Sequence, residues 1–135
     1  MNIETKLGHL AAKFDRRYHS EYSALVSGKK PKAKRPTEEE WLELLQLQHA
    51  VTVELLTSVK SLAHLHRRLI IWKSAELQRL LWLQWSNDKE ESTGWVVAAS
   101  ERQACQLHTI ARRNLFARQK AQRQAKTTSA SKVLQ

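Results

Sequence analysis

Helix-breaking residues are scarce in this chain, and their positions constrain the fold more than any other feature of the sequence. Of 135 residues only three are glycine and two are proline, and all five lie at or before Gly94. Because glycine and proline interrupt helices most strongly, long helices can run between these positions. The sequence therefore predicts an all-α fold.

The first 36 residues divide into a helix and a linker. Apolar side chains recur at spacings of three and four within residues 3–25, which predicts an N-terminal amphipathic helix over residues 1–27. Residues 28–36 contain five Lys or Arg together with Pro31 and Pro36, both of which disfavour a helix. We therefore expect a basic linker over this range.

The next ninety residues, 37–126, are predicted to form a helical core domain. Thr37 and Glu40 have the spacing of a capping box, so a helix is expected to begin there. As a single helix, residues 38–86 would measure ~73 Å at 1.5 Å per residue, so we expect a kink, a break or a long antiparallel hairpin. Whether this stretch is one helix or two stays open. A turn at 87–94 then precedes a basic C-terminal helix.

The middle of the chain is rich in tryptophan. Over residues 69–85 the apolar side chains spread around the whole helix, which must therefore be covered on more than one side. The expected fold is a long helical hairpin or a three-helix bundle, and whether oligomerisation completes its core stays open. Residues 127–135 are expected to form a disordered tail. The predicted protein-interface residues are Trp72, Leu81, Trp82, Trp85 and Trp95.

Charge is distributed unevenly along the chain, whose formal net charge is +10. Residues 102–132 contain eight Lys or Arg, and no acid follows Glu101. The basic linker is a second positive block, and between the two blocks residues 38–59 contain five Glu and no Lys or Arg. This pattern favours binding to a polyanion, with nucleic acid first and an acidic protein or an anionic membrane surface as weaker alternatives.

A helical wheel separates two faces of the last helix, at ~100° per residue. The expected core face holds Val96, Leu107, Ile110, Ala111, Ala117, Ala121 and Ala125. The opposite face holds the candidate nucleic-acid-binding residues Arg102, Arg112, Arg113, Phe116, Lys120, Arg123 and Lys126. Further candidates in the linker are Lys29, Lys30, Lys32, Lys34 and Arg35. Lys and Arg neutralise phosphates, and an exposed Phe can stack on an unpaired base. The alternative is an ordinary solvated face, with Phe116 packed on another helix or subunit.

Patterns typical of catalytic or metal sites are not found in the sequence. His64 and His66 are two residues apart and point to different sides of a helix, so they cannot chelate one ion together. Cys105 and His108 can share a face, but no second pair at ligand spacing accompanies them. There is no glycine-rich phosphate loop and no nucleophile motif. We therefore expect neither enzyme activity nor a cofactor.

Cysteine content and hydropathy bear on the cellular location. A single cysteine excludes an internal disulfide and favours a reducing compartment. The N-terminus has no apolar signal region, and charged residues interrupt the most apolar stretch, so we expect no integral membrane segment. The expected location is cytoplasmic, or nuclear in a eukaryote or a virus, where the linker fits an import signal.

Residues 13–17, KFDRR, are similar to a Phe-Asp-Arg element near the start of the PriC family of small helical primosomal proteins. The similarity is confined to these residues, and no residue roles are transferred from it. From charge and composition, the sequence predicts a non-enzymatic, weakly sequence-specific nucleic-acid-binding accessory protein, for replication or for phage or plasmid functions. The alternative is a structural or adaptor protein that acts through a Trp-rich oligomer or partner interface.

Overall fold

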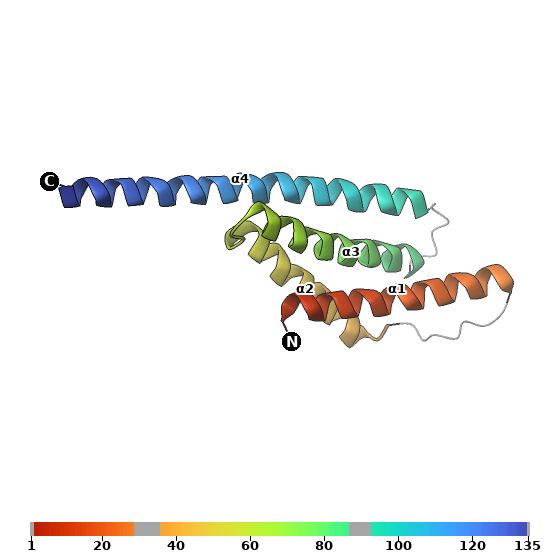
Figure 1. Ribbon diagram of the computed structural model, residues 1–135. Coiled ribbons are helices and arrows are strands. Elements are labelled where there is room, and N and C mark those ends of the chain that lie inside the picture. Colours follow the sequence, from red (N-terminus) through yellow and green to blue (C-terminus); the bar gives the residue numbers. More distant parts are fainter. Residues whose placement is uncertain (1, 29–35, 87–92, 135) are drawn as a thin grey trace.

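The computed structural model describes residues 2–28, 36–86 and 93–134, and every regular element in these ranges is an α-helix (Figure 1). The helices are α1 (Ile3–Ser27), α2 (Glu38–Thr57), α3 (Leu62–Ser86) and α4 (Thr93–Leu134). The predicted all-α fold is therefore confirmed. The predicted linker residues Lys29 to Arg35 and most of the predicted turn lie outside the described residues.

Residues 38–86, for which one helix or two was left open, form two helices. These are α2 and α3, joined by a corner at residues 58–61. This corner contains neither Gly nor Pro, and the hydroxyl groups of its two serines form hydrogen bonds with the two helices. The Ser58 hydroxyl donates to the Glu54 carbonyl at 3.3 Å, and the Ser61 hydroxyl accepts from the His64 amide at 3.1 Å. Such hydroxyls compete with the helical hydrogen-bond pattern and cap the helix that follows. The described part of the chain therefore holds four helices, one of the two outcomes that were left open.

The predicted capping box at the start of α2 is present. The Glu40 amide donates to the Thr37 hydroxyl at 3.2 Å, and the Thr37 amide donates to the Glu40 carboxylate at 3.3 Å. The same carboxylate reaches α1, where Lys13 Nζ lies 2.6 Å and Arg17 Nη1 2.9 Å away. The hydrogen bond from Lys13, followed by the one from Arg17, holds the pKa of Glu40 at about 2, against an ordinary 4.5 and in spite of burial. One side chain thus caps α2 and fastens α1 to it.

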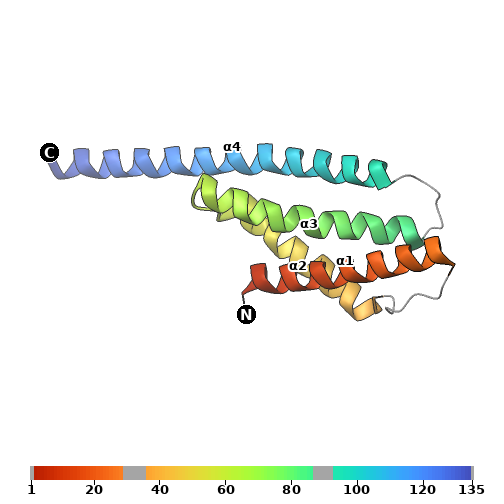
Figure 2. The ribbon, with the colours of Figure 1, turned by 45° about the vertical axis from the view of Figure 1, so that its right-hand side comes forward.

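Helix α3 lies between α1 and α4, and α2 runs obliquely from α1 toward the start of α3 (Figures 1 and 2). Contacts among the described residues agree with this arrangement, since α3 packs on α1, α2 and α4, and α2 also packs on α1 and α4. α3 is therefore covered on several sides, as its apolar circumference predicts.

The core is built around Phe14 of α1. Its fully buried ring lies 6.0 Å from the ring of Trp41 and 5.9 Å from that of Trp82, measured between centroids. Two more members of the 13–17 element also hold α1 in place, since Arg17 binds Glu40 and Asp15 accepts a hydrogen bond from Gln78 at 2.9 Å. This element therefore serves packing in the present fold.

Three of the predicted interface residues are part of this core instead. Trp72, Leu81 and Trp82 are only 8, 6 and 5% exposed within the single chain. The Trp72 indole also donates to the Thr52 hydroxyl of α2 at 2.8 Å, which satisfies its polar atom inside the fold. The interface prediction is wrong for these three residues, because α1, α2 and α4 already cover α3. The side chain of Trp85 lies outside the described part of the structure.

Candidate nucleic-acid interface

Helix α4 has two parts with different surroundings, a packed segment (residues 93–119) and a free segment (residues 120–134). In the packed segment the side chains of Val96, Ser100, Ala104, Leu107, Ala111 and Leu115 are buried. In the free segment every side chain from Lys120 to Thr128 is exposed. Figures 1 and 2 show why, since the helix continues beyond the corner between α2 and α3. The free segment is about 22 Å long at 1.5 Å per residue.

A pair of polar side chains marks the place where α4 leaves the bundle. Arg118 donates to the carbonyl oxygens of Leu56 and Val59 at 2.8 and 3.0 Å, and Asn114 donates to the Leu56 carbonyl at 3.2 Å. The carbonyls at the end of a helix have no partner within it, so these donors satisfy groups that α2 leaves open. The hydrogen bonds from Asn114 and Arg118 therefore fix α4 against the end of α2 and the corner.

Sequence reasoning did not single out Arg118 or Asn114. A signal existed, because Arg118 follows Ala111 by seven residues and therefore lies on the core side of the wheel. An arginine on a core face requires a buried acceptor. The acceptors are main-chain carbonyls at the end of α2 and in the corner that follows, whose positions the sequence did not reveal.

The predicted basic face is an exposed surface that spans both parts of α4. All six of its cations are exposed: Arg102, Arg112, Arg113, Lys120, Arg123 and Lys126. Of these, Arg102, Arg113 and Lys120 lie opposite to the buried residues of α4. Glu101, the single acid in the sequence of α4, lies 3.6 Å from Lys73 of α3. From residue 102 to 126 the face covers about 36 Å along the helix axis, and the sequence places no acid in it.

Two exposed aromatic residues of α4 lie far apart: Phe116 of the basic face, and Trp95, which precedes Arg102 by seven residues and therefore lies on the same side of the helix. Phe116 is 40% exposed, and the guanidinium carbon of Arg112 lies 5.3 Å from the centre of its ring, within the range of a cation–π contact. Trp95 is 52% exposed at the start of α4. The 21 residue steps from Trp95 to Phe116 correspond to about 32 Å, so the two rings do not form one stacking platform.

The apolar face of the wheel ends earlier than predicted. Ala117, Ala121 and Ala125 are exposed, and Ile110 is 48% exposed. The prediction is wrong for these residues because the bundle ends at the corner between α2 and α3, whereas α4 continues. The helix also extends to Leu134, where a disordered tail was expected from residue 127 onward.

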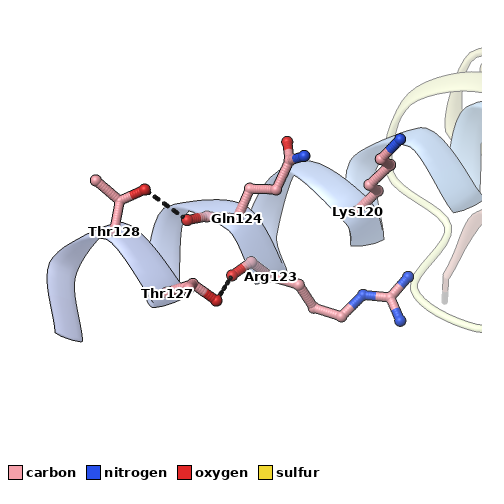
Figure 3. A pocket seen from close by; sticks show the side chains of 5 residues that line it. All are labelled: Lys120, Arg123, Gln124, Thr127 and Thr128. Atoms are coloured by element: carbon pink, nitrogen blue, oxygen red, sulfur yellow. Dashed lines mark hydrogen bonds between the residues drawn. The ribbon is translucent and has the colours of Figure 1, made fainter. Parts of the chain in front are cut away.

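A shallow hollow follows the free segment, lined by Lys120, Arg123, Gln124, Thr127 and Thr128 (Figure 3). All five lining residues belong to α4, so this is the flank of one helix and not an enclosed cavity. The hydroxyls of Thr127 and Thr128 donate to the carbonyls of Arg123 and Gln124, both at 2.9 Å. In this view the guanidinium of Arg123 reaches clear of the ribbon, whereas Lys120 lies across it.

Other features of the described residues offer less for function. A groove of about 380 Å³ between α1, α3 and α4 contains Tyr18, Tyr22 and Val97. The rings of His66 and His108 stack at 5.4 Å, but the described residues hold no group of three side chains suited to a metal ion. Within the described ranges, no helix is long and apolar enough to cross a membrane.

Comparison with known protein families, curated proteins and solved structures gave no match to this chain.

Proposed function

We propose that the protein is a non-enzymatic nucleic-acid-binding accessory protein with weak sequence specificity, and that the basic face of α4 is its binding surface. The observation that carries the proposal is the row of six exposed cations along one helix, in a stretch without acids. Phosphates repeat along a nucleic acid, so a row of cations meets several of them at once. The linker cations would extend this surface as an arm.

Electrostatic binding of this kind has a measurable signature. Each neutralised phosphate releases condensed counterions, and the slope of log affinity against log salt changes by about 0.9 per phosphate on duplex DNA. A face that engages many phosphates therefore gives steep salt dependence with little preference for sequence. Phe116 adds an exposed ring beside Arg112, which suits contact with a base or a sugar.

A matched pair of variants tests the proposal. Arg113/Lys120/Arg123→Ala removes three charges from the face, whereas Lys6/Arg16/Arg67→Ala removes three exposed charges from α1 and α3. Fluorescence anisotropy with labelled single-stranded DNA, duplex DNA and RNA would be measured across a salt series. We expect the face variant to lower the salt slope by up to about 2.7, at three contacts of ~0.9, and the control to change it far less.

Two results would count against the proposal. One is equal weakening by the two variants, which would mean that net charge alone matters. The other is absence of binding to every probe at low salt. That second result would favour the structural or adaptor function, for which the exposed ring of Trp95 is the remaining interface candidate among the described side chains.

A further inference from the structure

The free segment of α4 differs from the rest of the basic face in that a ligand can approach it from every side. All described side chains of this segment are exposed, whereas the packed segment has α2 and α3 against one side. A rod that is open all round can enter a groove, and a helix lying on a bundle can only be touched from its outer side. The proposal below depends on the proposed function and concerns what this segment binds.

The composition of the free segment excludes most protein partners. Between Phe116 and Val133 the sequence contains no apolar residue larger than alanine, and it contains no acid. A coiled-coil seam or an apolar groove requires large apolar side chains at helical spacing. The sequence of this segment has only Val133 and Leu134, which are adjacent and stand at its end. The same lack of an apolar face argues against a membrane surface. What remains is a polar partner of negative charge.

We propose that the free segment lies in the major groove of duplex DNA. An α-helix with its side chains is about 10–12 Å across, and the major groove of B-form DNA is about 12 Å wide. Lys120, Arg123 and Lys126 follow one another at steps of three and therefore lie on neighbouring parts of one side. Gln124 and Thr127 flank them with further polar groups. In this arrangement the bundle stays outside the groove, where Arg112 and Arg113 contact phosphates.

The contact at Arg118 gives the free segment a defined direction. Because the guanidinium is held by the Leu56 carbonyl at the end of α2 and the Val59 carbonyl of the corner, the axis of α4 is fixed where it leaves the bundle. An isolated helix of about 15 residues is only marginally stable in water, but here it continues a helix that has already formed. Its Ala, Gln, Lys and Arg residues favour that continuation. Binding in a groove would hold the segment helical along its length.

Other nucleic acids fit this segment less well. Duplex RNA has a deep, narrow major groove that side chains cannot read, so a helix of this diameter is excluded from it. Single strands are held by aromatic stacking, and residues 120–134 contain no aromatic side chain. The geometry therefore favours duplex DNA over both.

The test compares the full chain with a chain ending after Gln119. Both would be titrated onto a 20-base-pair DNA duplex, the RNA duplex of the same sequence and one of its DNA strands, at about 50 mM salt. We expect truncation to weaken binding to duplex DNA by about tenfold or more and to change binding to the other two probes by about threefold or less. Lys120/Arg123/Lys126→Gln, which keeps the helix length, should reproduce the loss on duplex DNA.

A modified duplex separates groove binding from contact with phosphates alone. Bulky groups on C5 of the pyrimidines fill the major groove and leave the backbone charge unchanged. We expect them to abolish the advantage of the full chain over the truncated one, and a minor-groove ligand such as netropsin to leave that advantage intact.

Several outcomes would overturn the inference: equal binding of both chains to duplex DNA, stronger binding to the single strand, or tolerance of the C5 groups. If Arg112/Arg113→Ala, which changes only the packed segment, loses binding while truncation does not, the inference fails and the proposed function stands. If neither chain binds any probe, both fail.

Discussion

The packed and free segments of α4 belong to one helix with a continuous basic face, yet different interactions stabilise the helical conformation of each segment. In the packed segment every turn sends a side chain into the core, from Val96 to Leu115, and packing decides its conformation. In the free segment no described side chain is buried, and helix propensity alone must hold it. The difference means that only the outer side of the packed segment is accessible, whereas the described side chains of the free segment are accessible all around the helix. Four predictions test this contrast.

The largest effect is expected in the packed segment. Leu115 is 1% exposed, and Leu115→Ala should lower the free energy of unfolding by about 2–5 kcal/mol, because it removes buried surface and leaves a cavity. Gln124→Ala in the free segment should change it by about 0.5 kcal/mol or less. Urea unfolding followed by tryptophan fluorescence measures both. A comparable loss in Gln124→Ala would mean that the free segment is packed in solution.

The next effect compares two arginines five residues apart. Arg118→Ala should lower the free energy of unfolding by about 1–3 kcal/mol. The Val59 carbonyl would lose its side-chain donor, and the Leu56 carbonyl would keep only the donor from Asn114. Arg123→Ala should leave stability unchanged and weaken nucleic-acid binding. Urea unfolding would show the loss of stability in Arg118→Ala, and anisotropy would show the loss of binding in Arg123→Ala. Equal changes of stability and of binding in both variants would remove the distinction between the two segments.

Acid should act on the bundle and spare the free segment, which contains no acidic residue or histidine. The pKa of Glu40 is lowered from 4.5 to about 2 in the folded chain, chiefly by Lys13. Its contribution is therefore fully present above pH 4.5 and lost as the pH falls toward about 2. Since Lys13 is half exposed and screened by solvent, that contribution is on the order of 1 kcal/mol.

Glu40→Gln tests this pH dependence. The variant should be less stable than the wild type at pH 7 and equally stable near pH 2, as measured by urea unfolding at a series of pH values. A stability difference that stays constant over the whole series would contradict the assignment.

The smallest effect concerns helix propensity. Ala121→Gly should lower the helical signal of the free segment, because glycine costs about 1 kcal/mol in a helix, and leave the unfolding midpoint unchanged. Ala111→Gly, at a fully buried position, should lower the midpoint. Circular dichroism and thermal unfolding separate the two. A lower midpoint in Ala121→Gly would show that the free segment unfolds together with the core.

The sequence predicts those features that depend on local spacing. The all-α fold follows from scarce glycine and proline, the start of α2 from Thr37 and Glu40, and the exposed cations from the helical wheel. Each of these depends on residues within a few turns of one another, which is the distance over which helix chemistry acts.

Features that depend on tertiary contacts were missed. The corner at residues 58–61 decides where the bundle ends along α4. This corner is made with serine hydroxyls and without the glycine or proline that usually ends a helix. Hydrophobicity cannot tell whether Trp72 and Trp82 meet a partner or their own chain. Glu76 is 3% exposed and accepts a hydrogen bond from Gln48 of α2 at 2.7 Å, so a residue that reads as polar surface is a core contact.

The exposure of the free segment also has an evolutionary consequence. Because no described side chain between Lys120 and Thr128 supports the core, substitutions there are free of selection for folding. One inserted residue would turn all following side chains by about 100° and advance them by 1.5 Å without disturbing the bundle. Ligand preference in descendants of this chain can therefore diverge while the body of the protein stays the same.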